Sequence, residues 1–203
     1  MPSYLTLATT SHVEPDPIKG SRFIGDACPV HNEEEARAFV ERIAASQPSA
    51  HHHCYAWRLE GGEGGARVED DGEPGGTAGK PILMRIDGRK LRGIVVVVTR
   101  YFGGTKLGKG GLVRAYGGTA GLALDDASIL EVQETLTVTL RLGYEDQSHI
   151  MGALHHFSLT PTSRSFEEIV TLTAEVPVED IDALSAQVRD RTAGRVEALW
   201  IAR

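Results

Sequence analysis

The 203-residue sequence lacks the features of membrane-spanning and secreted proteins. No apolar run approaches the roughly 18–20 residues that span a bilayer. The first residues, MPSYLTLATT, lack the basic start and apolar stretch of a secretory signal. The only two cysteines, Cys28 and Cys54, do not form a CxxC pair, so we expect two buried, reduced thiols. These absences indicate a soluble cytoplasmic protein with no membrane partner.

The sequence also lacks a positive net charge. Its formal charge of −7 argues against indiscriminate nucleic-acid binding. The charge is unevenly distributed, however: residues 80–114 contain nine basic residues and one acidic residue, whereas residues 128–203 contain six basic and twelve acidic ones. A solvated surface with scattered charges does not explain so uneven a segment. We therefore expect a basic surface built from the middle of the chain.

Hydrophobic periodicity predicts an N-terminal β/α domain over residues 1–127. Asn32 and Glu35 form a capping-box pattern at the start of one helix. The β-branched run at 93–99 is typical of a strand buried on both faces. The loop between residues 60 and 76 is too rich in glycine and acid to be packed structure. The expected elements are an extended segment at 18–30, helices at 33–46, 77–86 (capped by Thr77) and 112–124, and strands at 52–59 and 93–99.

The pattern changes after Asp125 and Asp126, and residues 128–203 are predicted to form a second domain. Residues 129–142 alternate between apolar and polar side chains, as a half-buried strand does. The resulting order, βαββαβ, is that of a ferredoxin-like domain, and the whole chain is predicted to be α+β. The other elements expected here are helices at 145–157 and 178–192 and strands at 159–163, 167–176 and 195–202.

The loop DDGEPGGTAGKP, residues 70–81, contains three carboxylates within four residues. Asp70, Asp71 and Glu73 could hold a divalent cation through oxygen ligands, or they could be solvated loop acids. The spacing does not match an EF-hand, and we predict no metal and no cofactor. Together with His52, which could do acid–base work, and with Thr77, these residues form a possible acidic or polar cleft.

A second glycine-rich loop leaves the buried strand and enters a helix. Its backbone N–H groups and the positive helix N-terminus favour anion binding. The segment GGTKLGKG matches the phosphate-binding P-loop motif except at its last position. Gly110 occupies the position where the motif requires Ser or Thr as a magnesium ligand. We therefore expect phosphate or nucleic-acid binding without phosphoryl transfer. The candidate residues are Arg100, Tyr101, Gly103, Gly104, Lys106, Gly108, Lys109, Gly110, Gly111 and Arg114.

Aromatic side chains flank the second loop. Tyr101 and Phe102 precede its glycines and Tyr116 follows them. Aromatics beside cations can stack on nucleic-acid bases. They can equally anchor the loop to the domain core, and the sequence leaves these two interpretations open.

Several long segments resemble the IMPACT/YigZ family. They are SRFIGDACPV with EEEARAFV, AHHHCYAWRL, DDGEPGGTAGKPIL and VVVVTRYFGGTKLGKGGLVRAY, within residues 20–124. Gly75 stands where the family has serine and Lys109 where it has threonine. The resemblance implies an N-terminal domain similar to domain IV of elongation factor G and to a small-subunit ribosomal protein domain. It also implies a C-terminal domain like the factor's fifth domain, and it brings no established catalytic activity.

The resemblance and the charge pattern together favour a non-catalytic, translation-related regulator that binds RNA or the ribosome through a basic glycine-rich face. Eukaryotic relatives regulate translation by binding the activator of an amino-acid-starvation kinase. One alternative is a protein-interaction module that uses the 60–80 loop and the acidic C-terminal domain. The other is an enzyme for a phosphorylated small molecule, with His52, Asp70, Asp71 and Glu73 facing the glycine loop. The oligomeric state is open.

Overall fold

The computed structural model describes residues 3–60, 65–196 and 198–201 and divides the chain into two units. The larger unit is Tyr4–Val132, and the smaller one contains the chain from Gln133 onward together with Ser3. The sequence-based border, between residues 127 and 128, lies five residues before this division. None of the helices in the described ranges is long and apolar enough to cross a membrane.

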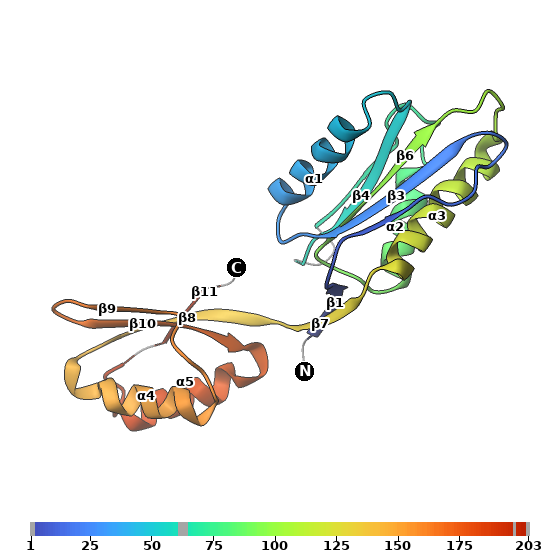
Figure 1. The fold of residues 1–203 in the computed structure, drawn as a ribbon. Coiled ribbons are helices and arrows are strands. Elements are labelled where there is room, and N and C mark those ends of the chain that lie inside the picture. Colours follow the sequence, from blue (N-terminus) through green and yellow to red (C-terminus); the bar gives the residue numbers. More distant parts are fainter. Residues whose placement is uncertain (1–2, 61–64, 197, 202–203) are drawn as a thin grey trace. The chain divides into compact units, whose positions relative to one another are not determined.

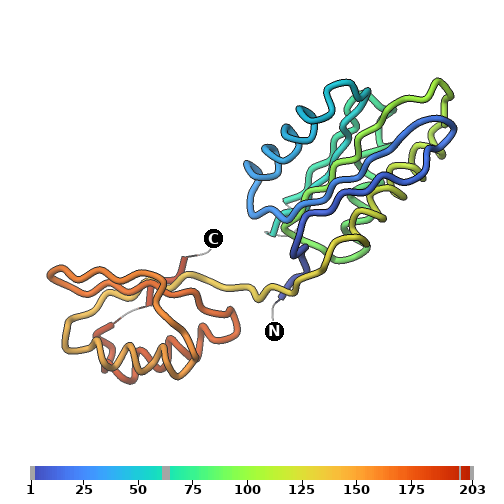
Figure 2. Tube along the Cα trace, viewed as in Figure 1, coloured from blue at the N-terminus to red at the C-terminus, as the bar shows by residue number. Residues whose placement is uncertain are grey.

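A five-stranded antiparallel sheet forms the centre of the larger unit (Figure 1). Its strand order is β2-β3-β6-β4-β5, so β6 lies between β3 and β4 although it follows both in the chain, as the trace in Figure 2 shows. Every neighbouring pair is antiparallel. The strands are β2 (Ser11–Val13), β3 (Arg22–Pro29), β4 (His52–Arg58), β5 (Ala66–Glu69) and β6 (Ile94–Tyr101).

Helices cover both faces of this sheet (Figure 1). On one face, Val95 and Val97 of β6 pack with Phe39 of α1 (Glu33–Ser46). On the other, Val96 and Val98 pack among α2 (Gly79–Gly88) and α3 (Gly108–Asp126). Because consecutive strand residues point to opposite faces, a strand covered on both sides needs an uninterrupted apolar run. The prediction for 93–99 is confirmed, since β6 is buried on both faces.

The start of α1 is also as predicted. The Asn32 side chain accepts a hydrogen bond from the Glu35 backbone N–H at 2.8 Å. The Glu35 carboxylate in turn accepts from the backbone N–H of His31 at 2.9 Å. The Asn32 side chain thus satisfies a donor that the helix leaves unpaired at its first turn. The Glu35 carboxylate bonds the residue before the N-cap, and not the N-cap N–H of a full capping box.

Other local predictions for the larger unit were wrong. Residues 66–69 are not loop but strand β5, paired with β4. Helix α2 begins at Gly79, and Thr77 does not cap it: its hydroxyl donates to the Pro74 carbonyl at 2.6 Å. Helix α3 begins at Gly108, four residues earlier than predicted, so half of the expected glycine loop is helical. Glycine is a poor helix former, and no local sequence pattern predicts a helix there.

Four further strands differ from the predictions. One is β9 (Ser163–Phe166), which was predicted at 159–163. The expected strand 129–142 is two strands, β7 (Ile129–Gln133) and β8 (Thr135–Leu142). Strand β7 pairs with β1 (Ser3–Leu7), for which we had no prediction.

The two free cysteines differ in burial. Cys54 is buried, whereas Cys28 is only half-buried, although we expected both thiols to be buried.

The smaller unit has the predicted ferredoxin-like arrangement. Its strands follow the sheet order β11-β8-β10-β9 with antiparallel neighbours, and two helices lie on one face (Figure 1). The core joins Val138 and Leu140 of the sheet to Ile150 and Leu184 of the helices. The remaining elements are α4 (Gln147–His156), β9 (Ser163–Phe166), β10 (Val170–Pro177), α5 (Ile181–Arg191) and β11 (Ala198–Ile201).

Candidate functional site

The two glycine-rich loops meet at one cavity in the larger unit. The cavity has a volume of about 400 Å³, within the range of small-ligand sites. The first loop contributes Glu73 and the second contributes Lys106, while β4 and β6 contribute side chains from the sheet. The residues that line it are His52, Glu73, Pro74, Arg100, Phe102, Lys106, Leu107, Gly108, Lys109 and Leu112.

A buried ion pair lies at the cavity. The Arg100 Nη1 is 2.6 Å from the Glu73 Oε1, and both side chains are about 95% buried. The Tyr116 hydroxyl donates to the same oxygen at 2.7 Å. Burial raises the pKa of this hydroxyl, which keeps it protonated as a donor. Removing one partner of such a pair leaves an unpaired buried charge, which is costly.

Arg100 is therefore a buried cavity residue and not an exposed surface cation. Its Nη2 donates to the Ser21 hydroxyl at 3.2 Å, and its guanidinium lies over the rings of Phe23 and Phe102. Its Nε is buried without a partner among the described residues. The guanidinium neutralises Glu73 rather than adding a positive charge to the surface.

The imidazole of His52 is oriented by the first loop. Its Nδ1 donates to the Asp71 carbonyl at 2.7 Å. The other ring nitrogen, Nε2, lies 3.9 Å from Glu73 Oε1. Because the hydrogen bond of Nδ1 fixes the tautomer of a neutral imidazole, Nε2 is then an acceptor.

The three carboxylates of the first loop diverge, so they do not form the cation site that the sequence left open. Asp70 accepts hydrogen bonds from the backbone N–H groups of Gly76, Ala78 and Gly79 at 2.7–2.9 Å. The exposed Asp71 accepts from the backbone N–H of His53. Within the described ranges, no group of three His, Cys, Asp or Glu side chains is placed to hold a metal ion.

Asp70 instead organises the start of α2. Partial burial alone would raise its pKa, but three backbone N–H groups hold the pKa of this carboxyl below its ordinary value. Its carbonyl also accepts from the Cys54 thiol at 3.1 Å. Burial raises the pKa of that thiol far above its ordinary value, so Cys54 is a core donor and not a nucleophile.

The second loop places two lysines at the start of α3. Lys106 and Lys109 are exposed and have no ion pair or hydrogen bond with the rest of the described chain. The N-cap residue of α3 is Leu107, and no side chain caps the helix. The first N–H groups of α3 are thus unpaired within the helix. Backbone donors and two cations gather at one rim of the cavity.

The structure leaves several predicted residues outside the cavity lining. Tyr101 points to the opposite face of β6 from Arg100, where its hydroxyl approaches Gln47. Thr77 is buried within the first loop, and Arg114 is exposed farther along α3. The other predicted residues outside the lining are Asp70, Asp71, Gly103, Gly104, Gly110 and Gly111.

The cavity also contains residues that sequence reasoning missed or left open. Tyr116 is fully buried and anchors the network, whereas Phe102 is 39% exposed and lines the cavity. Leu107 and Leu112 form an apolar wall.

The basic segment 80–114 does not form one surface. Arg85 donates to the Gly117 carbonyl at 3.1 Å, and Arg89 pairs with Asp125 at 2.6 Å. These arginines join α2 to α3. The lysines of the glycine loop account for the unpaired charge beside the cavity.

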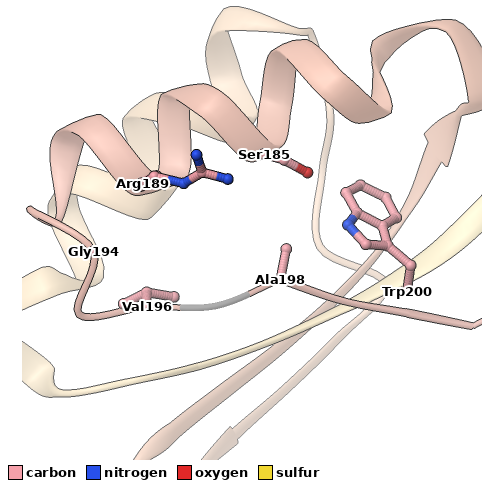
Figure 3. Close-up of a pocket in the computed structure, with 6 residues that line it drawn as sticks. All are labelled: Ser185, Arg189, Gly194, Val196, Ala198 and Trp200. Atoms are coloured by element: carbon pink, nitrogen blue, oxygen red, sulfur yellow. The ribbon is translucent and has the colours of Figure 1, made fainter.

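A second cavity, of about 520 Å³, lies in the smaller unit between α5 and β11 (Figure 3). Ser185 and Arg189 reach it from α5, and Ala198 and Trp200 reach it from β11. The sequence did not predict this cavity. It contains no buried ion pair like that of Glu73 and Arg100 among the residues described.

Comparison with known proteins identifies both units. The Impact N-terminal domain matches residues 19–124, and a domain of unknown function, DUF1949, matches residues 140–195. A crystal structure described as that of a hypothetical protein is similar over 100% of this chain and 99% of its own, with a TM-score of 0.77 and 35% identity.

Curated relatives are similar over nearly the whole chain. IMPACT family member YigZ of Escherichia coli is 36% identical over 91% of each chain. An IMPACT family member from Thermus thermophilus is 39% identical over 91% of this chain and 98% of its own. The IMPACT homolog of Dictyostelium discoideum matches 44% of this chain at 35% identity. The chain therefore belongs to the IMPACT family.

Proposed function

We propose that this protein is a non-catalytic, translation-related regulator that binds RNA or the ribosome in the cytoplasm. The observation that carries the proposal is the pair of unpaired lysines, Lys106 and Lys109, at the uncapped start of α3. Backbone N–H groups at a helix start and nearby cations are a recurring phosphate-binding arrangement. Membership in the IMPACT family supports a regulatory role at the level of the family.

The exposed ring of Phe102 adds a stacking surface beside these cations. Stacking on an aromatic face tolerates any base, and single-stranded nucleic acid is often bound this way. The net charge of −7 argues that binding is confined to this face and is not spread over the molecule.

The experiment measures binding of purified ribosomes and of a structured RNA to the full chain at low salt. The double variant Lys106→Gln/Lys109→Gln should weaken binding by at least tenfold, because two phosphate contacts are lost. Lys90→Gln, at an exposed lysine just after α2, is the matched control and should bind as the wild type does. Failure of both ligands to bind the wild type would remove the proposal.

A small-molecule site is the second candidate, because His52 and Glu73 do converge with the glycine loop at one cavity. Asp70 and Asp71, which the enzyme hypothesis also required, instead accept hydrogen bonds from backbone N–H groups, those of the α2 start and of His53 in β4. Assaying phosphate release from a panel of phosphorylated metabolites tests this candidate. A turnover lost in His52→Gln would favour it.

A further inference from the structure

One oxygen of the Glu73 carboxylate, Oε2, accepts no hydrogen bond from the described residues. Every hydrogen bond that described residues make to the Glu73 carboxylate goes to Oε1, from Arg100 and Tyr116. Glu73 lines the cavity, and its side chain is only 4% exposed. Oε2 is not one of the fully buried unpaired atoms of the described residues, so it can be reached from the cavity. A ligand in the cavity can therefore donate a hydrogen bond to it.

A second acceptor lies beside this carboxylate. In the imidazole tautomer whose Nδ1–H donates to the Asp71 carbonyl, Nε2 of His52 can accept, and it lies 3.9 Å from Glu73 Oε1. Two acceptors on neighbouring side chains suit a ligand with two adjacent hydroxyl groups. In nucleotide sites, a carboxylate of this kind commonly accepts from a ribose hydroxyl.

The other walls of the cavity have a different character. Lys106, Lys109 and the uncapped start of α3 favour an anion. Phe102, Leu107 and Leu112 give an apolar surface, and Phe102 is exposed enough to receive a flat ring. Hydroxyl acceptors, phosphate donors and an aromatic face together match the three parts of a nucleotide.

We propose that this cavity binds a ribonucleotide with a free 2′,3′-diol, whose hydroxyls donate to Glu73 and His52 and whose phosphate is held by Lys106 and Lys109. The same chemistry is offered by a ribonucleoside 5′-monophosphate and by the 3′-terminal nucleotide of an RNA chain. The inference rests on the proposed function, which it deepens by naming the feature of RNA that is recognised. The 2′-hydroxyl is also what distinguishes RNA from DNA.

Calorimetry on the full chain with adenosine 5′-monophosphate and its 2′-deoxy counterpart tests the proposal. The ribonucleotide should bind at least tenfold more tightly, because the deoxy ligand lacks one of the two hydroxyl donors. Glu73→Gln, which keeps the side-chain shape but replaces one oxygen by a donor, should bring the two affinities within twofold. Equal affinities for the wild type, no binding of either nucleotide, or discrimination that persists in Glu73→Gln would overturn the proposal.

Tyr116→Phe is the matched control. It removes another hydrogen bond to Glu73 without changing the cavity lining, so it should lose stability and keep the discrimination between the nucleotides. If Glu73→Gln does not fold, the wild-type comparison of the two nucleotides decides alone.

A third experiment distinguishes a free nucleotide from the 3′ end of an RNA chain as the ligand. It compares the binding of a six-nucleotide oligoadenylate that has a free 3′-hydroxyl with that of the same RNA carrying a 3′-phosphate. Weaker binding of the blocked RNA supports the chain terminus as the ligand. Equal binding, together with discrimination between the mononucleotides, supports a free nucleotide. If the protein binds ribosomes or RNA but binds the two mononucleotides equally, this inference is refuted and the proposed function is not.

Discussion

At the residue scale, Gly103 shows why the second loop needs glycine. A Cβ atom at this position would lie 1.9 Å from the backbone carbon of Gly20 and 2.1 Å from its oxygen. No side chain can be accommodated without moving the segment before β3. The requirement is therefore steric, and it holds whether or not the loop binds an anion.

Gly103→Ala should lower the free energy of unfolding by about 3 kcal/mol or more, because two backbone segments must separate. Gly110→Ala is the matched control in the same region. Nothing lies within 4 Å of a Cβ there, and alanine favours the helix, so stability should rise by up to about 1 kcal/mol. Urea denaturation measures both, and a neutral Gly103→Ala would contradict the packing.

The burial and the partners of individual charged side chains were the least predictable part of the site. The sequence correctly drew attention to Glu73 and Arg100 but could not show that they neutralise each other, since 27 positions separate them. Asp70 and Asp71 look equivalent in sequence, yet Asp70 accepts from three backbone N–H groups, two of them at the start of α2, and Asp71 is exposed. Burial and pairing depend on tertiary contacts that local patterns do not contain.

At the element scale, the first turn of α2 depends on Asp70, a residue eight positions before the N-cap. Asp70→Ala should cost about 1–2 kcal/mol of stability, because the loss resembles that of an N-cap side chain. Asp70→Asn keeps one acceptor and should cost less. Thermal unfolding at neutral pH would measure both losses, and an unchanged Asp70→Ala midpoint would refute the capping role.

The Asp70 contribution should also depend on pH. Its pKa is lowered in the folded protein, so the folded state favours the ionised carboxylate. The stabilisation is fully present above the ordinary carboxyl pKa of about 4 and is lost as the pH falls through the lower folded-state value. The stability difference between the wild type and Asp70→Asn should therefore shrink below about pH 4. A difference that is constant from pH 3 to pH 7 would contradict this reasoning.

Elements with a strong local pattern were predicted well, and the others were not. Helix α1 has both a capping-box sequence pattern and amphipathic periodicity, and β6 has an uninterrupted β-branched run, so both were located closely. The start of α3 was missed because its first turn contains three glycines and no side-chain cap. Strand β5 was missed because its pairing with β4 stabilises a sequence that looks like polar loop.

At the scale of the whole molecule, the two units have separate cores. The sequence located the change of pattern but could not show that β7 returns to pair with β1 at the other end of the chain. The backbone N–H of Ala8 also donates to the carbonyl of Ser128 at 2.8 Å. Local periodicity does not contain such long-range pairing, so the sequence-based border lies before β7.

A fragment of residues 1–133 should consequently be more stable than a fragment of residues 1–127. The shorter fragment lacks β7, so the hydrogen-bonding edge of β1 loses its partner. Urea denaturation of the two fragments compares them directly. Equal midpoints would show that the β1–β7 pairing does not stabilise the larger unit.

The salt dependence of RNA affinity shows whether the lysines beside the cavity bind RNA phosphates. The logarithm of the association constant should fall linearly with the logarithm of salt concentration, with a slope of about −0.7 to −0.9 for each phosphate contact. The Lys106→Gln/Lys109→Gln variant should have a slope about 1.5 units shallower than the wild type. A wild-type affinity that does not change with salt, or an equal slope in the variant, would contradict the account.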